Sequence, residues 1–244
     1  MLRHLGTKRT HGHNVKLATL LGVTAGFVNA AGFLAFSVLT TNVTGHAALF
    51  AERIAMGDWK TARVVALWMF LFLAGAFISS LIVSRLGRNQ RYSYVTPILA
   101  EAGILLTVSL AGSHYDHSLV SKELLAGSLL FAMGMQNSLV SIVSGSVVRT
   151  THLTGTFTDL GIELAQVLQK KTADTAALKT RIKLRCAIIF FFLCGALAGA
   201  YLFRYLRFYA FLVPVAILLF TLLADIFRIK VTHLYHRLQH PINK

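Results

Sequence analysis

The sequence predicts an all-α integral membrane protein with about six transmembrane helices, arranged as two inverted repeats of three spans each. Three observations predict this class. Of the 244 residues, 55% are hydrophobic and only 14% are charged, which departs from the composition of soluble domains. Apolar segments recur at lengths suited to a hydrocarbon core about 30 Å thick. A motif rich in threonine occurs twice, in residues 40–46 and 150–156. We therefore interpret residues 1–244 as one membrane domain.

Six segments are apolar enough, and about long enough, to cross such a core. They are residues 17–39, 64–84, 95–112, 124–145, 186–204 and 208–227. The first follows a charged leader, but it is longer than the apolar region of a signal peptide, so we expect it to be retained.

Basic residues gather beside these segments, in ranges 1–14, 85–91, 170–185 and 229–244. Because cytoplasmic loops carry an excess of Lys and Arg, this distribution predicts that both termini are cytoplasmic. If either threonine segment also crossed, strongly basic loops would lie outside. The net charge of +15 does not indicate nucleic-acid binding, since the cations lie at membrane edges. We expect these loops to contact anionic lipids of the bilayer.

The two halves of the chain resemble each other beyond the motif. Thr-Thr-Asn-Val-Thr-Gly-His at 40–46 corresponds to Thr-Thr-His-Leu-Thr-Gly-Thr at 150–156. Residues 70–76 and 190–196 share five of seven positions, and Gly26-x-x-Asn29 matches Gly134-x-x-Asn137. Repeat 1 covers about 15–113 and repeat 2 about 123–228. Because each repeat has three spans, the second enters the membrane from the opposite side, as in many secondary transporters.

The threonine segments are too short to span. A helix over residues 42–55 would be about 20 Å long, so it is either re-entrant or interfacial. In a helix over 151–168, a polar stripe lies beside an apolar one and contains His152, Thr156, Asp159 and Glu163. The equivalent stripe of the first copy contains Asn42, His46, Leu49 and Arg53. The two copies therefore share the same spacing of positions but differ in charge.

Three interpretations of these segments stay open. The acids Asp159 and Glu163, with His152, could form a proton or cation relay. The backbone N–H groups and hydroxyls at the start of each short helix, with Arg149, could hold an anion. Alternatively, each is an interfacial helix with a wetted face and a threonine N-cap. Separately, Glu101 is an isolated acid within an apolar span, where either a structural hydrogen bond or a transport role would explain it.

The candidate residues for binding a solute or ion are polar residues of both segments and of the neighbouring spans. They are Asn29, Thr40, Thr41, Asn42, Thr44, Gly45, His46, Glu101, Asn137, Arg149, Thr150, Thr151, His152, Thr154, Gly155, Asp159 and Glu163. No nucleophile elbow, metalloprotease motif, P-loop or dinucleotide fingerprint is present. We accordingly expect no catalytic residue, no metal site and no cofactor.

Three of these stretches carry a family resemblance. Gly-Met-Gln-Asn at 134–137, Arg-Thr-Thr-His-Leu-Thr-Gly-Thr at 149–156 and Thr-Asp-Leu-Gly at 158–161 resemble the YoaK-like family of bacterial inner-membrane proteins, a domain of unknown function. The resemblance covers most of the chain. It implies a multi-pass protein of the bacterial cytoplasmic membrane with about six spans, and it implies no substrate or catalytic residue.

The function favoured by these observations is transport or channel-like permeation of a small solute or ion, through a site between the two threonine segments. A membrane module that binds lipid or assembles a complex is the alternative, and an intramembrane enzyme is the third choice. Besides the bilayer and the solute, a second copy of the chain in a homo-oligomer is a partner left open.

Overall fold

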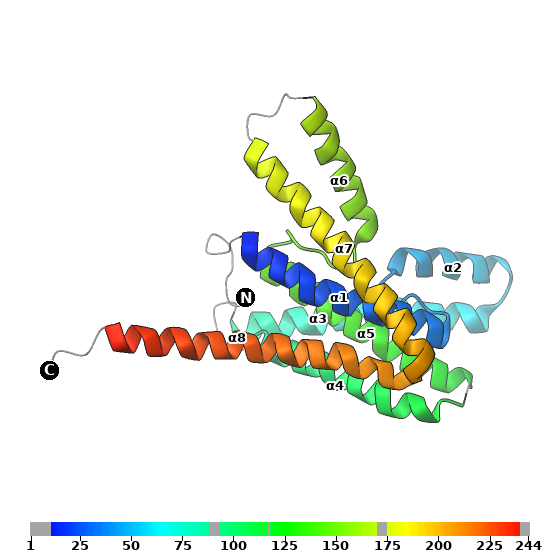
Figure 1. Ribbon diagram of the computed structural model, residues 1–244. Coiled ribbons are helices and arrows are strands. Elements are labelled where there is room, and N and C mark those ends of the chain that lie inside the picture. The colour runs from blue at the N-terminus through cyan, green and yellow to red at the C-terminus, as the bar shows by residue number, and fades with distance from the viewer. Residues whose placement is uncertain (1–10, 88–92, 117, 170–174, 240–244) are drawn as a thin grey trace.

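The computed structural model describes residues 11–87, 93–116, 118–169 and 175–239, which form helices and connecting turns (Figure 1). The elements are α1 (His11–Phe36), α2 (Val43–Ala55), α3 (Trp59–Leu86), α4 (Val95–Ala111), η2 (Gly112–His114), α5 (Leu119–Ser144), α6 (Leu153–Leu168), α7 (Thr175–Leu206), η3 (Arg207–Phe211) and α8 (Leu212–Gln239). The all-α class is confirmed. Residues 1–10, 88–92, 170–174 and 240–244, which belong to the basic tails and loops, lie outside the described residues.

Five segments of the described chain are long and apolar enough to cross a membrane. They are Gly12–Phe36, Trp59–Leu86, Val95–His114, Leu119–Ser144 and Thr175–Asp225. The last has 51 residues and covers the region where the sequence predicts two spans, 186–204 and 208–227. Within it, Arg207 adopts a left-handed backbone conformation (φ 50°), and the 3-10 turn η3 separates α7 from α8.

Most of the long helices run alongside one another in a bundle, whereas α6 and the first half of α7 stand out from its side (Figure 1). The start of α1 and the end of α8 lie at the same end of the bundle. The equivalent helix of the second half, α5, starts at the opposite end and follows α4 through a short turn. Helices α1 and α5, which occupy matching places in the two halves, therefore run in opposite directions.

Glycines allow two helix pairs to approach at backbone contact. A Cβ atom at Gly26 on α1 would collide with the carbonyl oxygen of Phe192 on α7. A Cβ atom at Gly134 on α5 would likewise collide with the carbonyl oxygen of Phe72 on α3. Small residues at an interface let helices pack this closely in a membrane. The α1–α7 and α3–α5 crossings thus make the same contact from corresponding positions.

The two crossings match on their other side as well. A Cβ atom at Gly195 on α7 would collide with the carbonyl oxygen of Val23, and one at Gly75 on α3 would collide with the carbonyl oxygen of Phe131. One polar bond reinforces the centre of the bundle, where the buried Gln136 on α5 donates from Nε2 to the carbonyl oxygen of Leu21, 2.7 Å away. Helix contacts of this kind satisfy polar groups where no water is available.

Large apolar side chains cover the outside of the bundle. Phe70, Leu73 and Phe77 on α3 are each at least 60% exposed, as are Phe190 and Leu197 on α7. An exposed apolar surface of this extent is unusual for a soluble monomer. It fits helices whose outer faces contact lipid tails.

Candidate functional site

The two threonine segments each form a turn followed by a short helix, α2 or α6. At about 20 Å and 24 Å, these helices are too short to cross a hydrocarbon core, and neither is among the five candidate spans. The turns before them begin in left-handed backbone, at Ser37 after α1 and at Gly145 and Ser146 after α5. Such turns end α1 and α5 and redirect the chain toward the two short helices.

The starts of α2 and α6 meet at one cavity of about 420 Å³. Its lining comes from corresponding places in the two halves: Asn29 and Asn137, Thr41 and Thr151, Asn42 and His152, Val43 and Leu153, Thr44 and Thr154, Phe72 and Phe192, together with Leu39 and Gly155. From this shared cavity, α2 and α6 diverge toward different ends of the molecule (Figure 1). The cavity is therefore built from both threonine segments.

One asparagine from each half fastens the turn before its short helix. The side-chain oxygen of Asn29 on α1 accepts a hydrogen bond from the backbone N–H of Thr41, at 3.1 Å. The side-chain oxygen of Asn137 on α5 accepts one from the Thr151 hydroxyl, at 2.8 Å. Both residues sit one turn beyond the close-contact glycines, Gly26 and Gly134. The helix crossings consequently place the two amides at the cavity wall.

The starts of the two short helices differ in their capping. In α2, the side chain of Asn42 accepts a hydrogen bond from the N–H of Gly45, at 2.9 Å. In α6, His152 holds the corresponding position and makes no capping bond. Its Nε2 atom instead lies 3.4 Å from Nδ2 of Asn137. The first backbone N–H groups of a helix have no partner within it, so the start of α6 can donate to a solute in the cavity.

His152 lies outside the candidate spans, and its surroundings favour the neutral ring. Burial lowers the pKa of His152, and the positive charge of Arg149 lowers it further. No side chain of Asp, Glu, Lys or Arg is among the described residues that line the cavity. The polar groups of the cavity are thus amides, hydroxyls and one imidazole, which bind small polar solutes by hydrogen bonds, and apolar side chains form the rest of its wall.

Part of each polar stripe of α2 and α6 faces inward. His46 is 4% exposed, with its ring centroid 5.9 Å from that of Trp68 on α3. Its counterpart Thr156 is 3% exposed, and Glu163 on the same stripe is also buried. By contrast, Phe157 and Leu168 on the apolar stripe of α6 are exposed. Helix α6 therefore turns part of its charged face to the protein and its apolar face outward.

The acids of α6 pair with α7. Arg185 Nη2 lies 3.0 Å from Asp159 Oδ2, and its Nε lies 3.9 Å from Glu163 Oε1. Arg181 Nε lies 3.7 Å from the same Glu163 oxygen. Arg185 also donates from Nη1 to the carbonyl oxygen of Val147, at 3.5 Å. In the first half, Arg53 occupies the place of Glu163 and lies 3.9 Å from Asp58.

The remaining predicted site residues do not line the cavity. Thr40 and Thr150 are fully buried behind it, and the N–H of Gly45 is used in capping. Arg149 is exposed, and Asp159 and Glu163 belong to the α6–α7 ion pairs. Glu101 is fully buried on α4, and neither carboxyl oxygen has a hydrogen-bond partner in the described chain.

Sequence reasoning missed the apolar part of the lining and the partners of the acids. Phe72 and Phe192 lie in the repeated stretches 70–76 and 190–196, but nothing in an apolar run marks them as cavity residues. By sequence, Arg185 is only one cation of a basic loop. Its one available signal was its place inside a long helix, where an arginine near the membrane needs a partner.

Comparison with known proteins places the chain among transmembrane proteins. Residues 17–224 match the model of a family described as "Protein of unknown function (DUF1275)". The UPF0700 transmembrane protein YoaK of Bacillus subtilis (strain 168) is 28% identical over 185 residues, which are 75% of this chain and 81% of that protein. No solved structure matches the chain. Because the match covers most of the chain, this protein belongs to the DUF1275 family of transmembrane proteins.

Proposed function

We propose that the protein is a permease or channel for a small solute or ion, and that the cavity between α2 and α6 is its binding site. The observation that carries this proposal is the origin of the lining, because paired residues from both halves surround one cavity. Sites at the interface of two repeats, where short helices meet, are typical of secondary transporters.

The proposal includes six spans in two inverted repeats. The η3 turn supports counting α7 and α8 as separate spans, since it divides the 51-residue apolar segment. The opposite directions of α1 and α5 support an inverted relation. The reciprocal contacts Gly26–Phe192 and Gly134–Phe72 support a two-fold axis between the halves. Under this arrangement α2 and α6 are re-entrant, and the membrane is the bacterial cytoplasmic membrane with both termini inside.

The burial of the polar stripes favours permeation over the alternative, a non-transporting lipid-binding or assembly module. An interfacial helix would turn its apolar face to the acyl chains and its charged face to headgroups and water. Helix α6 instead turns part of its charged face to the protein, with Glu163 buried against α7. This orientation suits a helix that enters the apolar layer and keeps its polar groups on the protein side.

The lining also indicates which solutes to test first. Two helix starts carry partial positive charge, and no acidic side chain among the described residues lines the cavity. A small anion, or a neutral solute with hydrogen-bond acceptors, therefore fits better than a cation. In this reading Asp159 and Glu163 hold α6 in place and do not carry protons through the site.

The test uses two glycines of α6 as a matched pair. A Cβ atom at Gly155 or at Gly161 would meet nothing within 4 Å, so cysteine is tolerated at both positions. Only Gly155 lines the cavity. Each cysteine is introduced in a background carrying Cys186→Ser and Cys194→Ser, and the protein is reconstituted in liposomes. Fluxes of small anions, small cations and neutral polar solutes are then measured before and after thiol modification with a bulky reagent.

We expect flux of at least one solute, blocked by modification of Gly155→Cys and unchanged by modification of Gly161→Cys. The same solute should slow the modification at residue 155. If no solute crosses faster than through protein-free liposomes, or if both variants respond alike, the permease proposal fails.

A further inference from the structure

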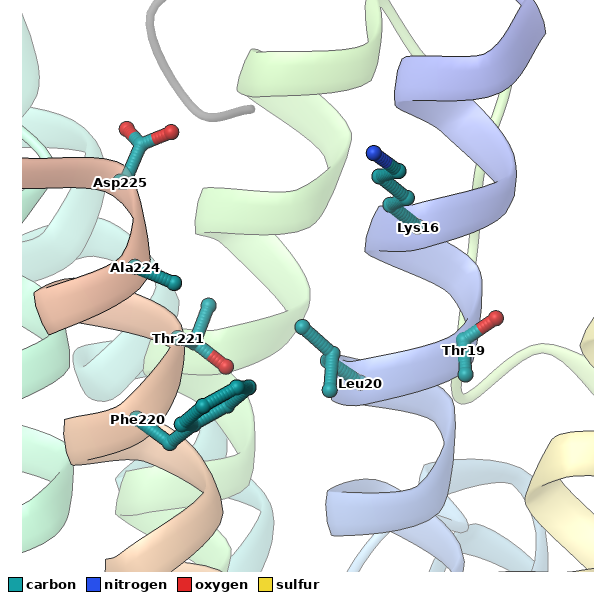
Figure 2. A pocket seen from close by; sticks show the side chains of 7 residues that line it. All are labelled: Lys16, Thr19, Leu20, Phe220, Thr221, Ala224 and Asp225. Carbon is teal, nitrogen blue, oxygen red and sulfur yellow. The ribbon is translucent and has the colours of Figure 1, made fainter. Parts of the chain in front are cut away.

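A second cavity, of about 440 Å³, lies between α1 and α8, away from the site described above (Figure 2). Its walls are Lys16, Thr19 and Leu20 of α1 and Phe220, Thr221, Ala224 and Asp225 of α8. Both helices place their charged residue at the same end of the cavity, Lys16 from one wall and Asp225 from the other, and the other lining residues follow below them. The cavity is thus polar at one end only.

Two threonine hydroxyl groups lie in the part of the cavity below the charged end, but they do not make it polar. Thr19 Oγ1 donates to the carbonyl oxygen of Val15, at 2.9 Å, and Thr221 Oγ1 donates to that of Ile217, at 2.7 Å. Because both hydroxyls bond within their own helices, these threonines add little polarity to the cavity. Leu20 and Phe220 supply most of the apolar wall, and Phe220 is 62% exposed.

The position of the charged end matches a membrane boundary. The apolar stretch of α1 begins at residue 17, directly after Lys16, and the apolar stretch of α8 ends at residue 227, just beyond Asp225. The polar end therefore lies where headgroups would lie, and the apolar wall lies where acyl chains would lie. Lysine at a helix end commonly reaches toward this interface.

We propose that this cavity binds a phospholipid with a phosphoethanolamine headgroup. The phosphate would pair with the ammonium group of Lys16, the lipid ammonium would donate hydrogen bonds to the Asp225 carboxylate, and an acyl chain would lie against Leu20 and Phe220. Charge complementarity selects this headgroup. An anionic headgroup would meet the negative charge of Asp225, and a choline headgroup has no N–H to donate.

The experiment measures the affinity of the first lipid bound to the purified full-length protein by native mass spectrometry. The probes are phosphatidylethanolamine, phosphatidylcholine and phosphatidylglycerol with identical acyl chains. For the wild type we expect phosphatidylethanolamine to bind about tenfold more tightly than phosphatidylcholine, the size of one charge-assisted hydrogen bond. Phosphatidylglycerol should bind more weakly than phosphatidylethanolamine.

Substitutions of Asp225 and Lys16 test which residue contacts which part of the headgroup. Asp225→Asn should abolish the preference for ethanolamine over choline. Lys16→Gln should weaken both lipids about tenfold, and Lys16→Arg should retain binding, which separates loss of charge from misfolding. Lys60→Gln, at an exposed lysine of α3 that does not line the cavity, is the matched control and should change nothing.

Three outcomes would overturn the proposal. Equal affinities for ethanolamine and choline lipids would show that Asp225 does not distinguish between the two headgroups. A persistent preference in Asp225→Asn would place the site elsewhere. Stronger binding of phosphatidylglycerol that depends on Lys16 would indicate ordinary attraction of anionic lipid to a basic surface. None of these results bears on flux through the α2–α6 cavity, so the two proposals fail separately.

Discussion

Arg185 on α7 places its guanidinium 3.0 Å from the carboxylate of Asp159 on α6, and the same side chain reaches Glu163 and the carbonyl oxygen of Val147. One arginine thereby connects α7 with α6 and with the turn that carries the cavity residues Thr151 and His152. In the part of the first half that the structure describes, no arginine makes such a connection, because Leu49 and Arg53 occupy the positions of the two acids. The docking of the two short helices therefore differs between the halves.

Removal of the arginine should loosen α6. We expect Arg185→Gln to lower the thermal stability of the detergent-solubilised protein, since Glu163 is only 7% exposed and would be left with Arg181 alone. A double-mutant cycle with Glu163→Gln should give a coupling of about 0.5–3 kcal/mol. Arg204→Gln, an exposed arginine near the other end of α7, is the control. Additive effects of the two substitutions would contradict the ion pair.

The close helix crossings predict that alanine in place of glycine lowers stability at some positions and raises it at another. Gly26→Ala and Gly134→Ala should each destabilise the protein by about 1–3 kcal/mol, because the new methyl group meets backbone that cannot move aside. Gly103→Ala on α4 meets nothing within 4 Å and should stabilise the protein slightly through its helix propensity. Unfolding monitored by circular dichroism distinguishes these outcomes, and equal tolerance at all three positions would refute the close crossings.

The charge of the cavity can be changed at Asn137 with little change in shape. Asn137→Asp keeps an oxygen that accepts from the Thr151 hydroxyl but adds a carboxylate at the wall. If the site takes anions, their flux should fall by tenfold or more while cation flux rises, because a like charge in a poorly solvated site is strongly disfavoured. Asn137→Ser, which stays neutral, should preserve the selectivity. Unchanged selectivity in the aspartate variant would exclude Asn137 from the pathway.

The neutral state of His152 predicts the pH dependence of flux. Burial and Arg149 lower its pKa below the usual value of 6.5, so the ring is neutral at pH 7 and gains a proton only in more acidic solution. Anion flux should therefore be constant around neutral pH and should increase in acid as the ring becomes positive. His152→Asn, which copies the first half at Asn42, should keep the neutral-pH flux and lose the acid response. An acid response that survives this substitution would assign it to another group.

The carboxyl group of Asp116, just before α5, should make the stability of the fold depend on pH. Hydrogen bonds from Ser121 and from Ser118, including its backbone N–H at 3.0 Å, lower the pKa of Asp116 from 3.8 to about 2. A depressed folded-state pKa stabilises the fold above pH 3.8, and this contribution is lost as pH falls toward 2. Asp116→Asn should accordingly lower the melting temperature near neutral pH, and the difference from wild type should shrink in strong acid. A constant difference would show that the carboxylate charge plays no part.

Much of the architecture follows from composition and pattern. Apolar runs of membrane-spanning length predict long helices, because the backbone in lipid must satisfy its own hydrogen bonds. The repeated threonine segments predict two short helices at matching places, and α2 and α6 begin at Val43 and Leu153. The shared spacing of Asn29 and Asn137 after a glycine predicts that they occupy matching places, and both line the cavity.

Contacts between segments distant in the sequence were decided only by the tertiary structure. The sequence placed Asp159 and Glu163 in a stripe with His152, but it could not show that Arg185, in the next helix, would pair with them. Nor could it distinguish Phe72 and Phe192 from the other apolar residues around them. Local pattern determines where helices form and which face is polar, since backbone hydrogen bonds and hydrophobicity act within one segment. Which faces meet depends on packing between segments, and here the glycine crossings decide it.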